Sequence, residues 1–422
     1  MMQDTEYVEV QYSLNFADQA LQYINAVDRG FLNKCFLDAL DKMPNVSIHF
    51  NHKLTGANFD KKVAWFEQLK VRADKNESRP NEIEVKFDLF IGADGAHSAT
   101  RYHLMKYARM NYEQEYIDTL WCEFRIEATS EGEHAISSSH LHIWPAGSFM
   151  FIAIPSSDGS FSCTLFAPAS HYNHIKESPK ENLPAYFKKH FAGVCPELIS
   201  EAALTEQFQQ NPHLPLISIK CTPYHFGSSV VILGDAAHAM VPFYGQGMNA
   251  GLEDTRILFS HLDTYDVFDV LAKPSERIKR QSQALAAYTA QRTPDAHTIN
   301  DLAMGNYREM SSNVRSPTYK LRKLLEETVS VKIPWTGWRT QYARVSFEDQ
   351  RYSEVAREVR RQGKLLVIGM VLAPLGIGAL AFASWRFSWW VATGSHGPPA
   401  SVSRLFDWID VKGHEKFPNV FS

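Results

Sequence analysis

The chain has 422 residues and a formal net charge of −4 at pH 7. This length can bury a large core in about one to three domains, and the charge gives no electrostatic reason to expect binding to nucleic acid. The five cysteines are scattered and form no Cys-x-x-Cys pair, so neither a disulfide framework nor a zinc site is predicted, and a reducing compartment fits. Residues 1–12 are polar and acidic, which predicts no signal peptide.

The first predicted elements lead into a buried strand. Residues 22–43 carry apolar side chains at helical spacing and predict a helix with one apolar stripe. Residues 46–84 predict short strands and loops around a polar turn. The run Phe87–Ile91 then predicts a buried strand that ends in Gly-x-Asp-Gly at Gly92–Gly95, followed by a short loop and the basic residue Arg101.

Residues 117–225 have a different pattern, which predicts an antiparallel sheet. Proline, glycine and serine separate four aromatic and β-branched runs at hairpin spacing, and these runs are 121–126, 140–144, 149–154 and 160–166. His140 and His142 alternate and so share a face. Two histidines without a carboxylate at ligand spacing predict ordinary strand residues and no metal site. Residues 170–210 predict a helical excursion from the sheet.

The chain is organised around the stretch that follows this sheet. The apolar run Val230–Leu233 predicts a strand buried on both faces, and it ends in Gly234 and Asp235. Open α/β sheets bind ligands at the carboxyl ends of their strands. A glycine-rich loop follows, and Asn249 opens a predicted helix whose first N–H groups attract negative charge. A carboxylate, a glycine loop and a helix N-terminus together suit a cofactor with a polyol chain and a ring that becomes anionic on reduction.

The chain after Asn249 is predicted to be mainly helical, and its most distinctive part is Leu365–Trp385. This run has no charged residue and is long enough for the ~20 residues that span a bilayer. Basic residues precede it, and tryptophans at its end would form an interfacial belt. A membrane-spanning helix with the large N-terminal part in the cytosol is therefore predicted, and a buried core helix is the alternative.

The two strand-and-glycine motifs together resemble the aromatic-ring flavin monooxygenases of the p-hydroxybenzoate hydroxylase type, in which both motifs contact FAD. Within that group, three stretches are similar to the kynurenine 3-monooxygenases, namely Leu141–Pro145, Cys163–Phe166 and Gly234–Gly251. The resemblance covers about residues 22–385. It implies an α/β protein with a Rossmann-like FAD-binding domain, an antiparallel-sheet substrate domain, and a C-terminal helical region with a membrane anchor.

The resemblance also implies a division of the chain. The FAD-binding domain is expected at 1–115 and 226–260, the substrate domain at 116–225, the helical region at 261–362, the anchor at 363–390 and a polar tail at 391–422. No Gly-x-Gly-x-x-Gly run occurs in the sequence, although the family carries one at its extreme N-terminus. The FAD-binding domain is therefore expected to be incomplete, in a chain that is truncated at its N-terminus.

The resemblance assigns roles to individual residues. The expected FAD contacts are Arg29, Asp94, Gly95, Gly234, Asp235, Pro242, Gly247, Met248 and Asn249. Asp235 is expected to hold ribityl or pyrophosphate-side hydroxyls. Asn306 and Tyr342 are expected to hold kynurenine, since an amide and a phenol suit an amino-acid head group. No metal is expected, and no side chain is expected to act as a catalytic base, because the substrate amine activates its own ring.

The implied reaction is hydroxylation of L-kynurenine to 3-hydroxykynurenine with NADPH and O₂, a step of tryptophan degradation and NAD biosynthesis. It is expected to pass through a hydroperoxide at flavin C4a, with the flavin carrying the chemistry. The implied location is the mitochondrial outer membrane, with the main domain facing the cytosol. Two alternatives stay open: a flavin hydroxylase for another aromatic acid, and an inactive, truncated, membrane-anchored remnant that does not retain FAD.

Overall fold

The structure, a computed structural model, describes residues 8–10, 29–69, 82–177, 182–311 and 317–393. The chain divides into two compact units, of which the first ends at Ala356 and the second begins at Arg357. Helix α11 (Tyr352–Thr393) begins in the first unit and continues in the second. Every residue of the candidate site described below belongs to the first unit.

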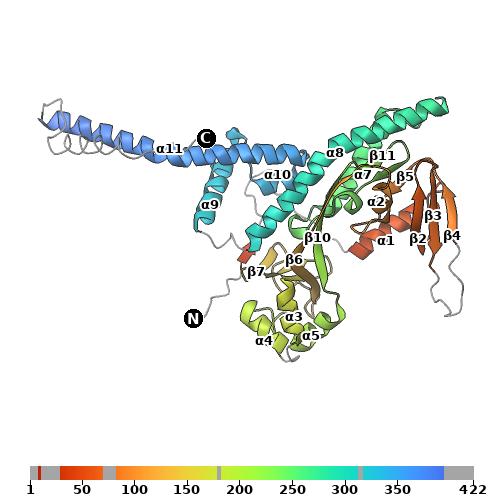
Figure 1. The fold of residues 1–422 in the computed structure, drawn as a ribbon. Helices are drawn as coiled ribbons and strands as arrows, with labels where there is room; N and C mark the ends of the chain where they lie inside the picture. Colours follow the sequence, from red (N-terminus) through yellow and green to blue (C-terminus); the bar gives the residue numbers. More distant parts are fainter. Residues whose placement is uncertain (1–7, 11–28, 70–81, 178–181, 312–316, 394–422) are drawn as a thin grey trace. The chain divides into compact units, whose positions relative to one another are not determined.

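The largest sheet among the described residues has six strands in the order β1-β7-β8-β9-β6-β10 (Figure 1). Every neighbouring pair is antiparallel, which confirms the predicted antiparallel sheet. Its strands are β1 (Val8–Val10), β6 (Asn111–Ile126), β7 (Leu141–Pro145), β8 (Met150–Pro155), β9 (Phe161–Ala167) and β10 (Leu214–Thr222).

Strand β6 begins at Asn111, well before the apolar run at 121–126 that predicted it. Residues 111–116 are exposed and pair only with β10, so they form a two-stranded ribbon. Because residues 111–116 of β6 are all exposed, this half of the strand lacks the alternation of polar and apolar side chains that marks a half-buried strand.

Three helices cover one face of this sheet, as the helical excursion predicted. They are α3 (Ala169–Glu177), α4 (Asn182–His190) and α5 (Glu201–Gln210). Aromatic rings fill the space between helices and strands, with Phe187 of α4 in edge contact with Phe124 and Phe151 at centroid distances of 5.6 and 5.5 Å. Such edge-to-face pairs add about 0.5–1.5 kcal/mol each beyond the burial of their area.

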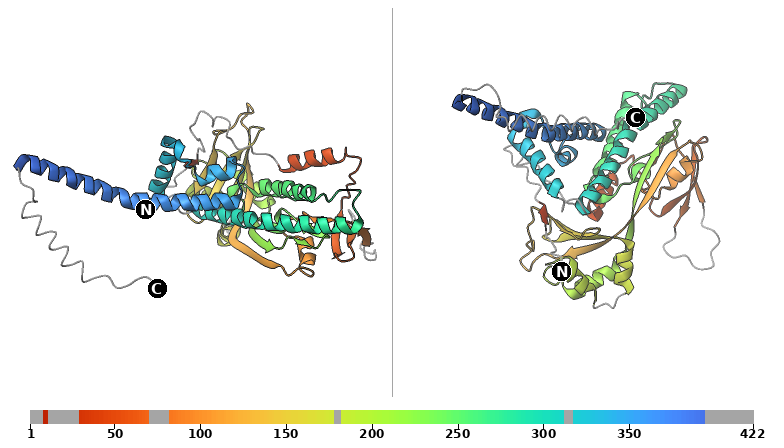
Figure 2. Two further views of the ribbon diagram at one scale, coloured as in Figure 1. Left: turned by 90° about the horizontal axis from the view of Figure 1, so that it is seen from above. Right: turned by 60° about the vertical axis from the view of Figure 1, so that its left-hand side comes forward.

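A second sheet holds the two motif strands. It consists of β11 (His225–Phe226), β12 (Val230–Ile232) and β5 (Phe90–Gly92), in that order. All three residues of β12 are fully buried, as the apolar run predicted. Helices α7 (Gly247–Thr264) and α8 (Pro274–Ser311) pack side by side, and both contribute to the core around β12 (Figure 2).

A buried asparagine on α8 joins this core to the large sheet. Asn300 is fully buried, and its Nδ2 donates to the carbonyl oxygens of Ile219 and Ala239 at 3.0 and 2.9 Å. Its Oδ1 accepts from the Ser218 hydroxyl at 2.8 Å. One side chain thereby fixes β10 against the segment that follows the Gly-Asp motif.

The N-terminal region differs in part from its prediction. A third sheet is formed by β2 (His52–Asn58), β3 (Val63–Gln68) and β4 (Glu82–Lys86), which are antiparallel, while residues 46–50 form no strand. Helix α1 spans Arg29–Leu40, and residues 22–28 of the predicted helix lie outside the described residues. No residue of α1 is buried among the described residues.

The C-terminal helices are α9 (Pro317–Lys332), α10 (Gln341–Phe347) and α11. Among the residues that the structure describes, no helix combines the length and the apolar character needed to cross a membrane. The transmembrane anchor predicted at 363–390 is therefore not confirmed.

We predict that Asn300→Ala lowers the free energy of unfolding by about 3 kcal/mol, because three buried hydrogen bonds are lost, to Ser218, Ile219 and Ala239. The measurement is the urea midpoint followed by circular dichroism. Thr298→Ala on the same helix is the control, since Thr298 only donates to Pro294 of its own helix, and we expect it to change stability by less than about 0.5 kcal/mol. Equal midpoints for the two variants would contradict the role of Asn300.

Candidate active site

The two glycine motifs meet at one edge of the second sheet. Strand β12 runs parallel to β5, with Val231 opposite Ile91 and Ile232 opposite Gly92. The backbone N–H of Leu233 extends this ladder by donating to the Gly92 carbonyl at 3.0 Å. Parallel strands end at the same edge, so the loops that begin at Ala93 and Gly234 emerge side by side.

The first loop is shaped by Asp94. One carboxylate oxygen accepts from the Ser98 hydroxyl at 2.5 Å, and the other accepts from the backbone N–H and the hydroxyl of Thr100 at 2.9 and 3.0 Å. These bonds hold the start of α2 (Ala99–Leu104) against the loop. Gly95 follows with φ +79° and has no heavy atom within 4 Å of where a Cβ would stand, so its backbone faces open space.

Arg101 ties the first loop to the second. Its guanidinium donates to the carbonyl oxygens of Ala96 and Ala236 at 2.6 and 2.7 Å, and the side chain is 5% exposed. Ala96 belongs to the first loop and Ala236 to α6 (Asp235–His238). The basic residue that the sequence placed after the first motif is thus a clamp between the two motifs.

The second loop presents a carboxylate to solvent. Gly234 has φ +58° and ψ −144°, a conformation that essentially requires glycine, and it turns the chain into α6. Asp235 is exposed and accepts no hydrogen bond from the described residues. Surrounding protein atoms desolvate its carboxyl enough to raise its pKa, whereas the charges of His238 and Arg29 act in the opposite direction. The predicted residue Arg29 therefore lies close to Asp235.

Helix α7 begins beside this loop with free backbone donors. Gln246 is its N-cap residue, and no side chain caps the helix. Its first three residues are Gly247, Met248 and Asn249, of which the last two are exposed. One turn further, Gly251 approaches Gly234, because a Cβ on Gly251 would stand 3.7 Å from the Gly234 Cα. The N-terminal turn of α7 is thus held next to the Gly-Asp turn.

A buried charge network that the sequence did not predict lies behind this arrangement. Asp254 of α7 is fully buried, and its Oδ2 accepts from the Gly234 backbone N–H at 2.7 Å and from His238 Nε2 at 2.6 Å. Its Oδ1 accepts from Arg292 Nε of α8. Burial opposes ionisation of Asp254, yet the charges of His238 and Arg292 hold its pKa below its ordinary value. His238 lies within the motif stretch and Asp254 follows it by three residues, whereas nothing in the sequence pairs Arg292 with them.

The two predicted substrate residues both contact the turn between the motif and α7. This turn is the helix η1 (Pro242–Tyr244), in which Pro242 is exposed. Asn306 Nδ2 donates to the Phe243 carbonyl at 2.6 Å. The Tyr342 ring stacks on Tyr244 at a centroid distance of 6.1 Å, and burial raises the pKa of its hydroxyl.

Aromatic side chains surround the same turn. Phe243 lies against Phe166 of β9 and stacks on Tyr307 of α8, with centroids 4.9 and 4.5 Å apart. The Tyr307 hydroxyl shares a hydrogen bond of 2.7 Å with Thr119 of β6. The turn is therefore held between the large sheet and α8, and the predicted residues Pro242, Asn306 and Tyr342 gather around it.

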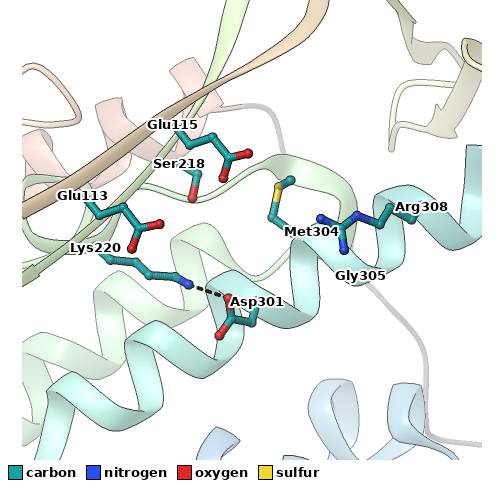
Figure 3. A pocket seen from close by; sticks show the side chains of 8 residues that line it. All are labelled: Glu113, Glu115, Ser218, Lys220, Asp301, Met304, Gly305 and Arg308. Atoms are coloured by element: carbon teal, nitrogen blue, oxygen red, sulfur yellow. Dashed lines mark hydrogen bonds and ion pairs between the residues drawn. The ribbon is translucent and has the colours of Figure 1, made fainter.

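A polar cavity of about 290 Å³ lies elsewhere, between the β6-β10 ribbon and α8 (Figure 3). Glu113 and Glu115 reach it from β6, and Lys220 of β10 forms an ion pair there with Asp301 of α8. No residue predicted to bind cofactor or substrate lines this cavity. It does not belong to the predicted site.

We predict that Gly234→Ala destabilises the chain by about 1–3 kcal/mol, because an alanine would be strained at this φ and ψ even though its Cβ would meet no atom within 4 Å. The measurement is the urea midpoint. Gly305→Ala, at a helical position of α8 that is equally open, is the control and should stabilise by about 0.5–1 kcal/mol. A Gly234→Ala midpoint at or above that of the wild type would contradict the described turn.

Comparison with known proteins identifies the family and the fold. The family model described as FAD binding domain matches residues 1–303. Among solved structures, a probable FAD-dependent monooxygenase from Pseudomonas aeruginosa, pqsL, aligns with a TM-score of 0.51 at 18% identity, covering 68% of this chain and 71% of that one. At this level of identity the match supports the fold alone.

Curated relatives are much more similar. The kynurenine 3-monooxygenase of Aspergillus terreus is 58% identical over 366 residues, which cover 86% of this chain and 73% of the relative. That of Neosartorya fischeri is 56% identical over 367 residues, covering 86% and 72%, and that of Chaetomium globosum is 58% identical over 363 residues, covering 84% and 76%. The chain belongs to the kynurenine 3-monooxygenase family of FAD-binding monooxygenases.

Proposed function

We propose that this chain binds FAD and hydroxylates L-kynurenine to 3-hydroxykynurenine, with NADPH and O₂ as co-substrates. Membership of the kynurenine 3-monooxygenase family supports this activity. The observation in the structure that carries the proposal is the meeting of the two glycine motifs at adjacent strand ends beside the start of α7. This reading is favoured over hydroxylation of another aromatic acid because the highly identical relatives are named for kynurenine.

The residues at this edge fit FAD. Gly95, Gly234 and Gly245 have positive φ and no atom within 4 Å in the direction of a Cβ, so a ligand can approach the backbone at all three positions. Asp235 offers an acceptor that no described residue uses, suited to the hydroxyls of a ribityl chain. The uncapped N–H groups of Gly247, Met248 and Asn249 suit the negative charge of a reduced isoalloxazine.

FAD, when bound, supplies the redox chemistry and the activation of O₂, and the side chains position and shield the reactants. In the overall reaction one oxygen atom of O₂ enters the kynurenine ring, and the other leaves as water. NADPH provides the two electrons and a hydride-derived proton, and a second proton comes from solvent. The substrate amine activates its own ring, so the proposal assigns no side chain as a general base.

The turn at Pro242–Tyr244 is proposed as the wall between cofactor and substrate. Asn306 and Tyr342 contact this turn from α8 and α10 and are proposed to hold the amino-acid group of kynurenine. Phe243 and Phe166 provide apolar surface for the aromatic ring and exclude water. Arg29, Asp94, Gly95, Gly234 and Asp235 remain proposed contacts of FAD.

The experiment that tests the function measures FAD retention and product formation by the purified chain. We expect bound flavin in the visible spectrum and kynurenine-dependent formation of 3-hydroxykynurenine by mass spectrometry. Salicylate-type acids are the comparison substrates, and faster turnover of one of these would favour the other flavin hydroxylase. A chain that retains no flavin and forms no product would overturn the proposal.

Within this experiment, Tyr342→Phe should raise the KM for kynurenine about tenfold with little change in kcat, because one hydrogen bond to the bound substrate is lost. Tyr116→Phe is the control, since Tyr116 is exposed on the β6-β10 ribbon and contacts none of the proposed site residues. An unchanged KM in Tyr342→Phe would remove Tyr342 from the substrate site.

The sequence also supports a proposal about location. We propose that the uncharged run Leu365–Trp385 attaches the chain to a membrane, and the mitochondrial outer membrane is the expected one. We predict that the full chain stays in the membrane pellet after a sodium carbonate wash, whereas a version that ends at Lys364 moves to the supernatant. Release of the full chain by carbonate would overturn the attachment.

A further inference from the structure

We propose that Asp254 is the positioning residue of the FAD site, which holds the Gly-Asp turn and the N-terminal turn of α7 in the geometry that FAD requires. Asp254 itself is fully buried and faces away from solvent, so it has no contact with cofactor or substrate to offer. This role rests on the proposed binding of FAD. Asp254 acts through Gly234 and His238, which it holds by hydrogen bonds.

The first step is the contact between Asp254 and Gly234. The Gly234 N–H donates to Asp254 Oδ2 at 2.7 Å, and Gly234 immediately precedes the exposed carboxylate of Asp235. Gly234 has φ +58° and ψ −144°, and this hydrogen bond holds its N–H in the orientation that belongs to that conformation. A single hydrogen bond from α7 thereby sets the direction in which the Asp235 side chain leaves the turn.

The second step is that the same carboxylate fixes both ends of the short helix α6. His238 Nε2 donates to Asp254 Oδ2 at 2.6 Å, and His238 is the last residue of α6. Since Gly234 precedes α6 and His238 ends it, Asp254 holds the whole turn of helix that carries Asp235. The His238 side chain is buried and Gly234 is partly buried, so water competes little for these two hydrogen bonds.

The third step connects Asp254 to the start of α7. Arg292 binds Asp254 Oδ1 through Nε and also donates to the Ala250 carbonyl at 2.9 Å. The Arg292 guanidinium lies 5.8 Å from the centre of the Tyr352 ring, and the Tyr352 hydroxyl donates to Gln246 Oε1 at 3.2 Å. Gln246 is the N-cap of α7, so one buried ion pair reaches both proposed FAD-binding elements.

A buried ion pair with three donors on one carboxylate contributes little net stability compared with apolar residues of the same shape. Its value here is geometric, since no neutral side chain of this size accepts from Gly234, His238 and Arg292 together. The amide of an asparagine would point its NH₂ group at Arg292 or at Gly234 and His238, and one of these contacts would become a donor–donor contact.

The test compares Asp254→Asn with the matched control Glu253→Gln. Glu253 also pairs with Arg292, at 2.7 Å, and loses the same charge, but it has no contact with Gly234. FAD affinity is measured by flavin fluorescence, and folding by circular dichroism and thermal unfolding. We expect Asp254→Asn to raise the Kd for FAD by at least about tenfold, the loss of one charge-assisted hydrogen bond. Glu253→Gln should leave the Kd within about twofold.

Comparing the Kd for FAD with kcat at saturating FAD separates positioning from simple destabilisation. At saturating FAD, Asp254→Asn should keep a kcat for kynurenine hydroxylation close to that of the wild type, because Asp254 touches no reacting atom. A Kd for FAD in Asp254→Asn equal to that of the wild type overturns the positioning role and leaves the proposed function intact. A wild-type chain that binds no FAD overturns the proposed function, and the role of Asp254 toward FAD falls with it.

A second measurement decides the question if Asp254→Asn does not fold. Hydrogen exchange of the FAD-free wild-type chain reports directly on the Gly234 amide. The proposal requires this amide to be protected before FAD is added, to the same degree as the N–H groups of β12. Exchange of the Gly234 amide as fast as that of the exposed loop at 268–271 overturns the inference.

Discussion

The buried carboxylate of Asp254 is the interaction on which the arrangement of the site depends. A carboxylate without exposed surface must be paired and hydrogen-bonded, because its desolvation would otherwise cost several kcal/mol. Its three partners come from two separate places in the fold: Gly234 and His238 lie at the two ends of α6, and Arg292 lies on α8. The need to satisfy one buried charge thus brings the Gly-Asp turn, α7 and α8 into a single geometry.

Two further clamps extend this geometry to the rest of the first unit. Arg101 joins the loops of the two glycine motifs through carbonyl groups of Ala96 and Ala236. Asn300 of α8 donates to Ile219 of β10 and to Ala239, which follows α6. It thereby holds the segment after the Gly-Asp motif against the large sheet. Like Asp254, both side chains are buried and hydrogen-bond to groups of different segments of the chain, so that each one joins separate elements.

Local sequence patterns predicted the strands whose side chains are mostly buried. The continuous apolar run of β12 and the aromatic runs of β7, β8 and β9 appear as strands close to the predicted bounds. The exposed half of β6 was missed because its side chains lack the alternation of polar and apolar residues that marks a half-buried strand. The transmembrane anchor was predicted from an uncharged run, and no described helix meets the requirement for a span. The domain boundaries and the roles of the site residues stay predictions.

The sequence by itself determined that two apolar strands end in Gly-x-Asp-Gly and Gly-Asp and that a helix follows the second motif, because each of these signals is a contiguous run of residues. It could not determine that Asp254 pairs with Arg292, that Arg101 reaches Ala236, or that Asn306 and Tyr342 contact the same turn. These pairings join residues separated by many turns of chain, and only the packing of α7, α8 and the sheets brings their charges and hydrogen-bonding groups within reach of each other.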